Sequence, residues 1–197
     1  MSRAYLHMVS SAPPRGKNDT YDSGPAMVAI AIEDEALEIT RVIIRSIVPE
    51  TGWKLDAPWM AKYGCGLRAQ AEASLYSAVA DEVLEALAER PLLVAHFVGF
   101  HARVLTKLIP SEHPVFQQSA FCTMQQATQH TRIPDRWGKA FNAPNLDEAN
   151  AHFTGERLPD MTGLPWRESA AAYLTATRRV FWGIHRWGVA PAIELPA

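Results

Sequence analysis

Short-period alternation of hydrophobic and polar residues runs through the first quarter of the chain and predicts three β-strands. The strands are expected at residues 4–10, 26–32 and 37–48. Residues 33–36 would join the last two strands as a hairpin, whose acidic side chains Glu33, Asp34 and Glu35 are expected to be solvated. The pattern therefore predicts an antiparallel meander at the start of the fold.

Longer-period patterns follow, and strand-like segments alternate with helix-like ones. Residues 69–90 place apolar side chains at helical spacing, with Leu75, Val79 and Val83 on the expected buried face. A short strand-like segment is expected at 121–124, a loop from there to 145, and helices at 146–153 and 168–187. Strands that alternate with helices after a meander predict an α/β domain with a mixed sheet.

The most informative segment is residues 92–109, with the sequence LLVAHFVGFHARVLTKLI. Its apolar run ends at Ala95-His96, and after Gly99 the apolar residues recur at helical spacing. The segment is therefore predicted to be a buried strand followed by a helix. It would carry His96 and His101 to the junction between them.

Composition narrows the class of protein. At 197 residues, with 48% hydrophobic and 20% charged residues, the chain fits one globular domain, 1–197. Its net charge of −2 gives no overall basic field of the kind that duplex-binding proteins carry, although local basic patches remain open. Cys65 and Cys122 form no CxxC motif, which indicates a reducing compartment. Neither a signal peptide nor an apolar run of membrane length is recognised, so a cytoplasmic protein without membrane contact is expected.

Residues 94–101 resemble the second signature of the DnaQ-like (DEDD) 3′-to-5′ exonucleases, V-A-H-N-A-x-F-D. The matching residues are Val94, Ala95, His96 and Phe100. Phe97 takes the place of the asparagine, and His101 takes the place of the metal-binding aspartate. The frame of the motif is thus present while its metal ligand is replaced.

Further matches to this family occur in order along the chain. They are residues 46–53 with L-I-x-P-x-G-W, 63–66 with H-G-I-T, 121–124 with C-T-M, 144–156 with P-x-L-x-E and H-x-F-G-E, and 176–182 with A-C-A-R-V-F-W. The resemblance is to phage and proofreading-subunit members especially. It implies an RNase H-like three-layer fold, in which helices flank a central mixed five-stranded sheet.

Exonucleases of this family hold two Mg²⁺ or Mn²⁺ ions with four carboxylates and use a histidine as general base. At the positions that the resemblance assigns to these groups, this chain carries Met8, Ser10, His101, Glu168 and Tyr173. None of them supplies the family's group, so the resemblance implies a degenerate pocket with neither catalytic residues nor a metal cofactor. Alternation along the first strand would point His7 to the opposite face of the sheet.

Several single residues allow more than one interpretation. His96 is expected to be a structural histidine at the end of a buried strand. His101 could instead bind a soft metal such as zinc with His96 or Glu168. Asp19 and Asp22 could be displaced metal ligands if the register of the first strand differs. The tryptophans outside the predicted core elements are expected to be lids over the core: Trp53, Trp59, Trp137 and Trp166.

The first functional interpretation is a binding or scaffolding subunit of a nucleic-acid-processing complex, with a protein partner and with single-stranded nucleic acid in the former catalytic groove. The candidate contacts are Arg15, Lys17, His96, Phe97, Arg103 and Lys107, with Tyr173 as a further stacking surface. A protein-interaction module without nucleic-acid contact is the second interpretation, and the near-neutral charge favours it. An active metal-dependent exonuclease with unconventional ligands is the third, and a homodimer is compatible with all of them.

Overall fold

The fold is an α/β arrangement around one five-stranded sheet. The structure is a computed structural model, and it describes residues 1–13, 23–50, 52–63, 65–117, 119–161, 164–186, 188 and 190–195. The strands are β1 (Arg3–Ser10), β2 (Pro25–Glu33), β3 (Ile39–Ser46), β4 (Leu92–Ala95) and β5 (Phe121–Cys122). The helices are α1 (Ala57–Lys62), α2 (Leu67–Ala71), α3 (Tyr76–Ala86), α4 (Val98–Leu105), α5 (Thr123–Thr131), α6 (Leu146–Thr154) and α7 (Trp166–Ile184), with a 3₁₀ turn at Pro114–Gln117.

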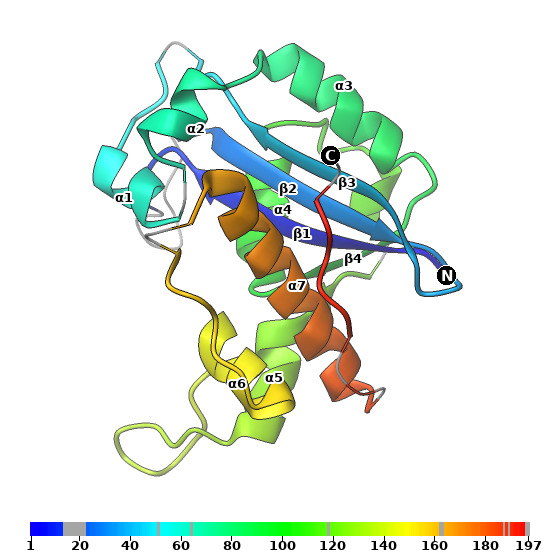
Figure 1. Cartoon of the computed structure of the whole chain (residues 1–197). Coiled ribbons are helices and arrows are strands. Elements are labelled where there is room, and N and C mark those ends of the chain that lie inside the picture. Colours follow the sequence, from blue (N-terminus) through cyan, green and yellow to red (C-terminus); the bar gives the residue numbers. More distant parts are fainter. Residues whose placement is uncertain are drawn as a thin grey trace.

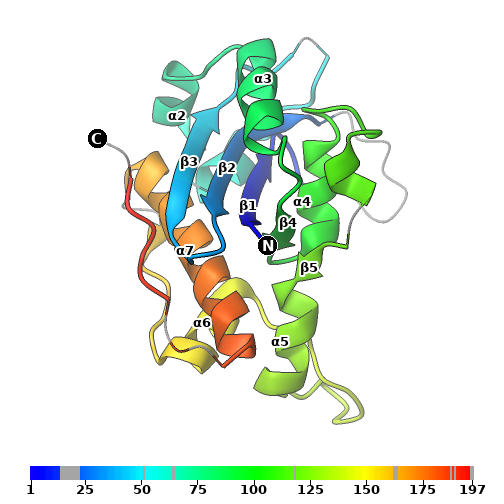
Figure 2. The same cartoon turned by 90° about the vertical axis from the view of Figure 1, so that its right-hand side faces the viewer.

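The sheet is mixed, as the sequence pattern predicts. Its strand order is β3-β2-β1-β4-β5. The meander β1–β2–β3 is antiparallel, whereas β4 runs parallel to β1 and β5 runs parallel to β4. Figures 1 and 2 show α7 lying across one face of the sheet, with α3 and α4 on the other. Within the part of the chain that the structure describes, no helix is both long enough and apolar enough to cross a membrane.

Strand β1 supplies side chains to the cores on both faces of the sheet. Tyr5 and Val9 pack with residues of α7 such as Leu174. Leu6 and Met8 point the other way and pack with residues of α3 and α4. All of β1 beyond its first residue is buried, including the polar residues His7 and Ser10, so neither face of this strand is marked by exposed polar residues.

Two helices differ from the sequence prediction. The helix expected at 69–90 is divided into α2 and α3, because Ser74 pairs its backbone N–H with Ser46 (2.9 Å) and accepts from Val48 (3.0 Å). Leu75, expected on the buried face, is 69% exposed at the start of α3. The segment after Cys122 is the helix α5 rather than a continued strand and loop.

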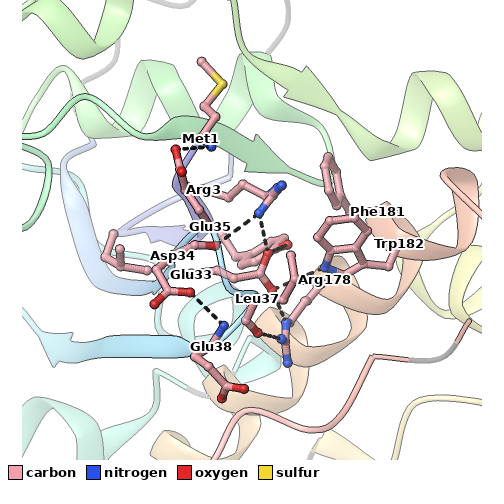
Figure 3. A network of polar contacts seen from close by, with 12 residues as sticks. Met1, Arg3, Glu33, Asp34, Glu35, Leu37, Glu38, Arg178, Phe181 and Trp182 are labelled. Carbon is pink, nitrogen blue, oxygen red and sulfur yellow. Dashed lines mark hydrogen bonds and ion pairs between the residues drawn. The ribbon is translucent and has the colours of Figure 1, made fainter. Parts of the chain in front are cut away.

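The hairpin between β2 and β3 contains a buried carboxylate, which corrects the expectation that its acidic residues are all solvated. Glu33 is fully buried. Its oxygens accept from Arg178 Nε (2.6 Å), Arg3 Nη1 (3.0 Å), Tyr5 Oη (3.0 Å) and Trp182 Nε1 (3.3 Å). Figure 3 shows Arg3 converging on Glu33 from the sheet, and Arg178 and Trp182 from α7. The network joins β1 and β2 to the last helix.

Replacing Arg178 with Met should lower the free energy of unfolding by about 3–5 kcal/mol, because the carboxylate of Glu33 would stay buried without its principal cation. Urea denaturation monitored by circular dichroism measures the change. The matched control is Arg41→Met, which breaks the ion pair to Glu85 (2.8 Å) at the exposed edge of the molecule and should leave the midpoint near that of the wild type. Equal midpoints for the two variants would contradict a central role for the buried pair.

Candidate functional site

A cavity of about 550 Å³ opens beyond the ends of β1 and β4. Its walls come from the end of β1, the junction of β4 with α4, helix α1 with its C-cap, the starts of α5 and α6, and the inner face of α7. The lining residues are His7, Met8, Val9, Trp59, Tyr63, His96, Phe97, Phe100, His101, Met124, Asn145, Leu146, Asp147, Leu158, Tyr173 and Thr177. Aromatic and apolar side chains dominate this set, which is typical of a small-molecule or nucleobase pocket.

His101 links the two strands that border the cavity. The pairing of β1 with β4 ends at Tyr5 and Val94. Beyond that point Nδ1 of His101 accepts from the backbone N–H of Met8 at 3.0 Å, and the ring also bonds to the backbone of His96. Burial lowers the pKa of His101 to about 4, so the ring is neutral at pH 7. Because Nδ1 is an acceptor, the single proton of this ring lies on Nε2.

His7 lines the cavity and faces α7 across it, which corrects the expectation that this side chain points to the opposite face of the sheet. The His7 ring stacks on Tyr173 with centroids 4.2 Å apart and an interplanar angle of 11°. The Met8 side chain is buried on the opposite face, with α3 and α4. Three residues of β1 thus line the cavity, namely His7, Met8 and Val9, and none of them carries a carboxylate.

Two of the other expected pocket positions lie elsewhere. The Ser10 hydroxyl donates to the carbonyl of Ala12 at 2.6 Å and does not line the cavity. Glu168 is exposed in the first turn of α7 and also lies outside it. Met8, His101 and Tyr173 do line the cavity, as expected from the sequence.

The candidate nucleic-acid contacts divide into three groups. Arg15 and Lys17 lie outside the described residues, as do the alternative metal ligands Asp19 and Asp22. Arg103 and Lys107 are exposed but do not line the cavity. His96 and Phe97 do line it, so of the described candidate contacts the structure brings only these two together at the cavity.

His96 ties the cavity rim to two neighbouring segments. Its Nδ1 lies 3.0 Å from Oγ1 of Thr123, and its Nε2 lies 3.0 Å from the carbonyl oxygen of Pro144. Burial lowers the pKa of His96 to about 4. With both ring nitrogens in protein hydrogen bonds, His96 has the structural role that the sequence predicts.

Phe97 stands at the rim in a strained backbone conformation. It is the N-cap of α4 and has φ 69° and ψ 56°, in the left-handed region. Its side chain is 50% exposed. A bulky residue in this region costs about 1–2 kcal/mol, whereas asparagine tolerates it well. The strain is therefore specific to the aromatic residue at this position.

Sequence reasoning missed the wall that α1 provides. Trp59 and Tyr63 lie with ring centroids 4.6 Å apart, and Trp59 Nε1 donates to the carbonyl of Ser10 at 3.1 Å. A sequence signal for the start of this helix was present. The Asp56 side chain caps α1 by accepting from the N–H of Trp59 (2.9 Å), and Pro58 follows in the first turn.

The lining does not fit the two divalent cations that the fold family implies. Among the lining residues that the structure describes, Asp147 is the one carboxylate, and it already accepts from Arg157 and from the N–H of Leu158 (2.8 Å). Divalent magnesium and manganese require several oxygen ligands. Both nitrogens of His101 are also occupied, which leaves it unsuited to zinc. Across the described ranges, no three or more His, Cys, Asp or Glu side chains gather closely enough to hold a metal.

Comparison with known proteins identifies the fold. No protein-family model and no curated protein sequence matches the chain. Among solved structures, the nuclease domain of 3′hExo, a DEDDh family member bound to rAMP, has a TM-score of 0.62 at 11% identity, with 98% of this chain and 97% of that one covered. E. coli exonuclease I bound to a dT13 oligonucleotide has a TM-score of 0.65 at 10% identity, with 93% of this chain covered.

A 3′-exonuclease solved in recognition of the histone mRNA stem-loop has a TM-score of 0.60 at 13% identity, with 93% of this chain covered. The present chain spans 64% of that structure and 40% of exonuclease I. The chain therefore has the RNase H-like fold of the 3′-exonucleases, with a five-stranded mixed sheet flanked by helices.

The buried histidines should make stability depend on pH in one direction. Between the ordinary histidine pKa of about 6.5 and the lowered pKa of about 4 for His101, the unfolded chain binds a proton that the folded chain does not. Stability should therefore fall as the pH decreases through this window. His101→Gln should reduce the slope of the unfolding free energy by up to about 1.4 kcal/mol per pH unit.

Urea denaturation at several pH values between 7 and 4.5 measures the slope. His152→Gln, which changes an exposed histidine of α6, is the matched control and should leave the slope as in the wild type. A His101→Gln slope equal to that of the control would show that the His101 ring is not held neutral.

Proposed function

We propose that this chain is a catalytically degenerate member of the exonuclease fold that binds single-stranded nucleic acid in the cytoplasm, as a subunit of a nucleic-acid-processing complex. Its cavity lies beyond the ends of β1 and β4 and retains a volume of about 550 Å³. Aromatic rings from different elements line it, among them Trp59, Tyr63 and Tyr173. Such rings stack on bases of any sequence.

Phe97 is the observation that carries this proposal. A side chain that is 50% exposed contributes little burial, yet its backbone stays in the left-handed region. Strained residues of this kind concentrate at functional sites. An aromatic ring at the rim of an aromatic-lined cavity is suited to stack on an unpaired base. Exchange of the family asparagine for Phe97 would thus add a stacking surface at a cost in stability.

Loss of hydrolysis follows from the residues at the end of β1. His7 and Val9 cannot bridge two hard cations, and the Met8 and Ser10 of the sequence-based register cannot do so either. The absence of carboxylates at these positions is thus independent of the register. Stacking of His7 on Tyr173 fills the space between β1 and α7 with neutral rings.

Single-stranded rather than duplex ligands are favoured by charge and shape. The net charge of −2 provides no broad basic field for a duplex. A cavity of this volume admits an unstacked base, not a base pair within a helix. The motif resemblance to phage and proofreading-subunit exonucleases supports a role beside a polymerase or nuclease partner.

Purified protein should not shorten single-stranded DNA or RNA in millimolar magnesium or manganese, and magnesium should leave its melting temperature unchanged. An ion bound by the folded state would raise that temperature by mass action. Denaturing gels of labelled oligonucleotides and thermal scans measure the two effects. Degradation that disappears in Asp19→Asn or Asp22→Asn would establish the active exonuclease with unconventional ligands instead.

Phe97→Asn should weaken binding of a single-stranded oligonucleotide at least about fivefold, because one base loses its stacking partner. Relief of backbone strain should offset the lost burial, so the free energy of unfolding should change by less than about 1 kcal/mol. Fluorescence anisotropy and urea denaturation measure the two quantities. Phe97→Tyr should retain affinity, and Leu67→Asn, at a position on α2 that is 89% exposed, serves as the control. Equal affinities of Phe97→Asn and wild type would remove Phe97 from the binding site.

A further inference from the structure

A hairpin between α5 and α6 projects from the body of the protein. In Figures 1 and 2 it is the yellow-green segment that extends away from the sheet at the bottom of both views. Its two arms pair at Pro134 and Phe141. The N–H of Asn142 donates to Ile133 at 2.7 Å, and the N–H of Asp135 donates to Ala140 at 2.9 Å. The projection is thus an internally bonded unit.

The tip of the hairpin is fixed by one side chain. Oδ1 of Asp135 accepts from the backbone N–H of Trp137 (3.0 Å) and of Lys139 (2.9 Å). The N–H of Gly138 donates to the Asp135 carbonyl at 3.1 Å, and Gly138 takes a positive φ of 67°. Because these bonds set the turn before any ligand arrives, ordering the tip adds little entropic cost to binding.

The tip holds its largest ring in solvent, which corrects the expectation that Trp137 is a lid over the core. Trp137 is 65% exposed, and Phe141 behind it is 45% exposed. The guanidinium of Arg136 lies 3.8 Å from the centre of the Trp137 ring system. The other expected lids behave differently, since Trp166 is buried and Trp59 lines the cavity. Tryptophan is enriched at binding interfaces, where its large ring covers apolar area and its N–H stays available to a partner.

The charge of the hairpin is opposite to that of the chain as a whole. Residues 131–143 contain Arg132, Arg136 and Lys139 against the single carboxylate of Asp135. All three cations are exposed, whereas the carboxylate is committed to the turn. The chain carries a net charge of −2, so this segment is a local basic patch around an exposed indole. An indole among cations matches the stacking and phosphate contacts of a single strand.

We infer that the hairpin 131–143 is a second single-strand-binding element, in which Trp137 stacks on an unpaired base while Arg132, Arg136 and Lys139 contact the flanking phosphates. The inference takes its class of ligand from the proposed function, but it uses none of the cavity residues. The hairpin is joined to the cavity rim through the hydrogen bond of His96 to Pro144. The base of the hairpin is thus attached to the rim that carries Phe97, while its tip extends away from the sheet.

Binding of a fluorescent oligothymidine by the full chain at several salt concentrations tests this element. Trp137→Ala should weaken binding at least about fivefold, and Trp137→Phe should restore most of it. Lys139→Gln should lower the slope of log affinity against log salt by about 0.7, the value for one lost phosphate contact. Arg68→Gln, an exposed cation on α2, is the matched charge control and should keep the wild-type slope.

Photo-crosslinking of a 5-iodouracil oligonucleotide, read by peptide mass spectrometry, adds a measurement without any variant, and crosslinks should map to 131–143. The hairpin element would be overturned if the wild type bound the oligonucleotide, Trp137→Ala bound it with unchanged affinity, and crosslinks mapped only to the cavity. The proposed function would then still stand. No binding by the wild type would overturn both. Binding lost in Phe97→Asn but not in Trp137→Ala would assign the ligand to the cavity alone. If Trp137 were required for binding a protein partner and the wild type bound no oligonucleotide through the hairpin, the hairpin would be assigned to protein contact and the inference would be overturned.

Discussion

The buried carboxylate of Glu33 is the constraint on which the position of the last helix depends. A fully buried charge is tolerated only when cations and hydrogen-bond donors surround it, and α7 supplies Arg178 and Trp182 to that end. The strong directionality of these bonds fixes α7 both along and around its own axis. Tyr173 lies five residues before Arg178 on the same helix, and it meets His7 of β1 in a parallel stack. The wall of the cavity is therefore set by an ion pair at the other end of the sheet.

His101 holds together the ends of two inner strands of the sheet, β1 and β4, as Glu33 holds the last helix. Where β1 and β4 part, a neutral imidazole accepts from one strand and bonds to the backbone of the other. An aspartate at that position could not offer a donor to a carbonyl at neutral pH. Clustered carboxylates repel one another in the absence of cations, whereas neutral rings pack without that penalty. Under the proposed function, the exchange of acids for His7, His101 and Tyr173 converts a site that depends on metal into one that is stable alone.

The sequence predicted the order of strands and helices because long periodic segments carry a strong pattern. It could not set the register of β1, since residues on both faces of that strand are buried and its buried polar residues, His7 and Ser10, are three positions apart and so do not mark a single face. The break between α2 and α3 could not be predicted, because it arises from tertiary pairing of Ser74 with the end of β3 and not from a helix-breaking residue. In the sequence, Glu33 is indistinguishable from a solvated acid at a hairpin tip. Its burial depends on Arg178, which lies 145 positions later in the chain. The short helix α1 was within reach, because Asp56 and Pro58 form a recognisable start signal.

Phe97 and Trp137, the residues of the two proposed contacts, share the energetic cost of exposing a large apolar ring to water. Each leaves a large apolar ring in water, 50% and 65% exposed respectively, on a backbone that is held in place. Asparagine at 97 and any polar residue at 137 would satisfy the same backbone and expose less apolar surface. Both segments meet at His96, which directly precedes Phe97 and bonds to Pro144 beyond the hairpin. The carbonyl of Pro144 accepts from the Nε2–H of His96, which this ring carries in its neutral and in its protonated form. A single strand spanning both rings would therefore depend on the same buried imidazole.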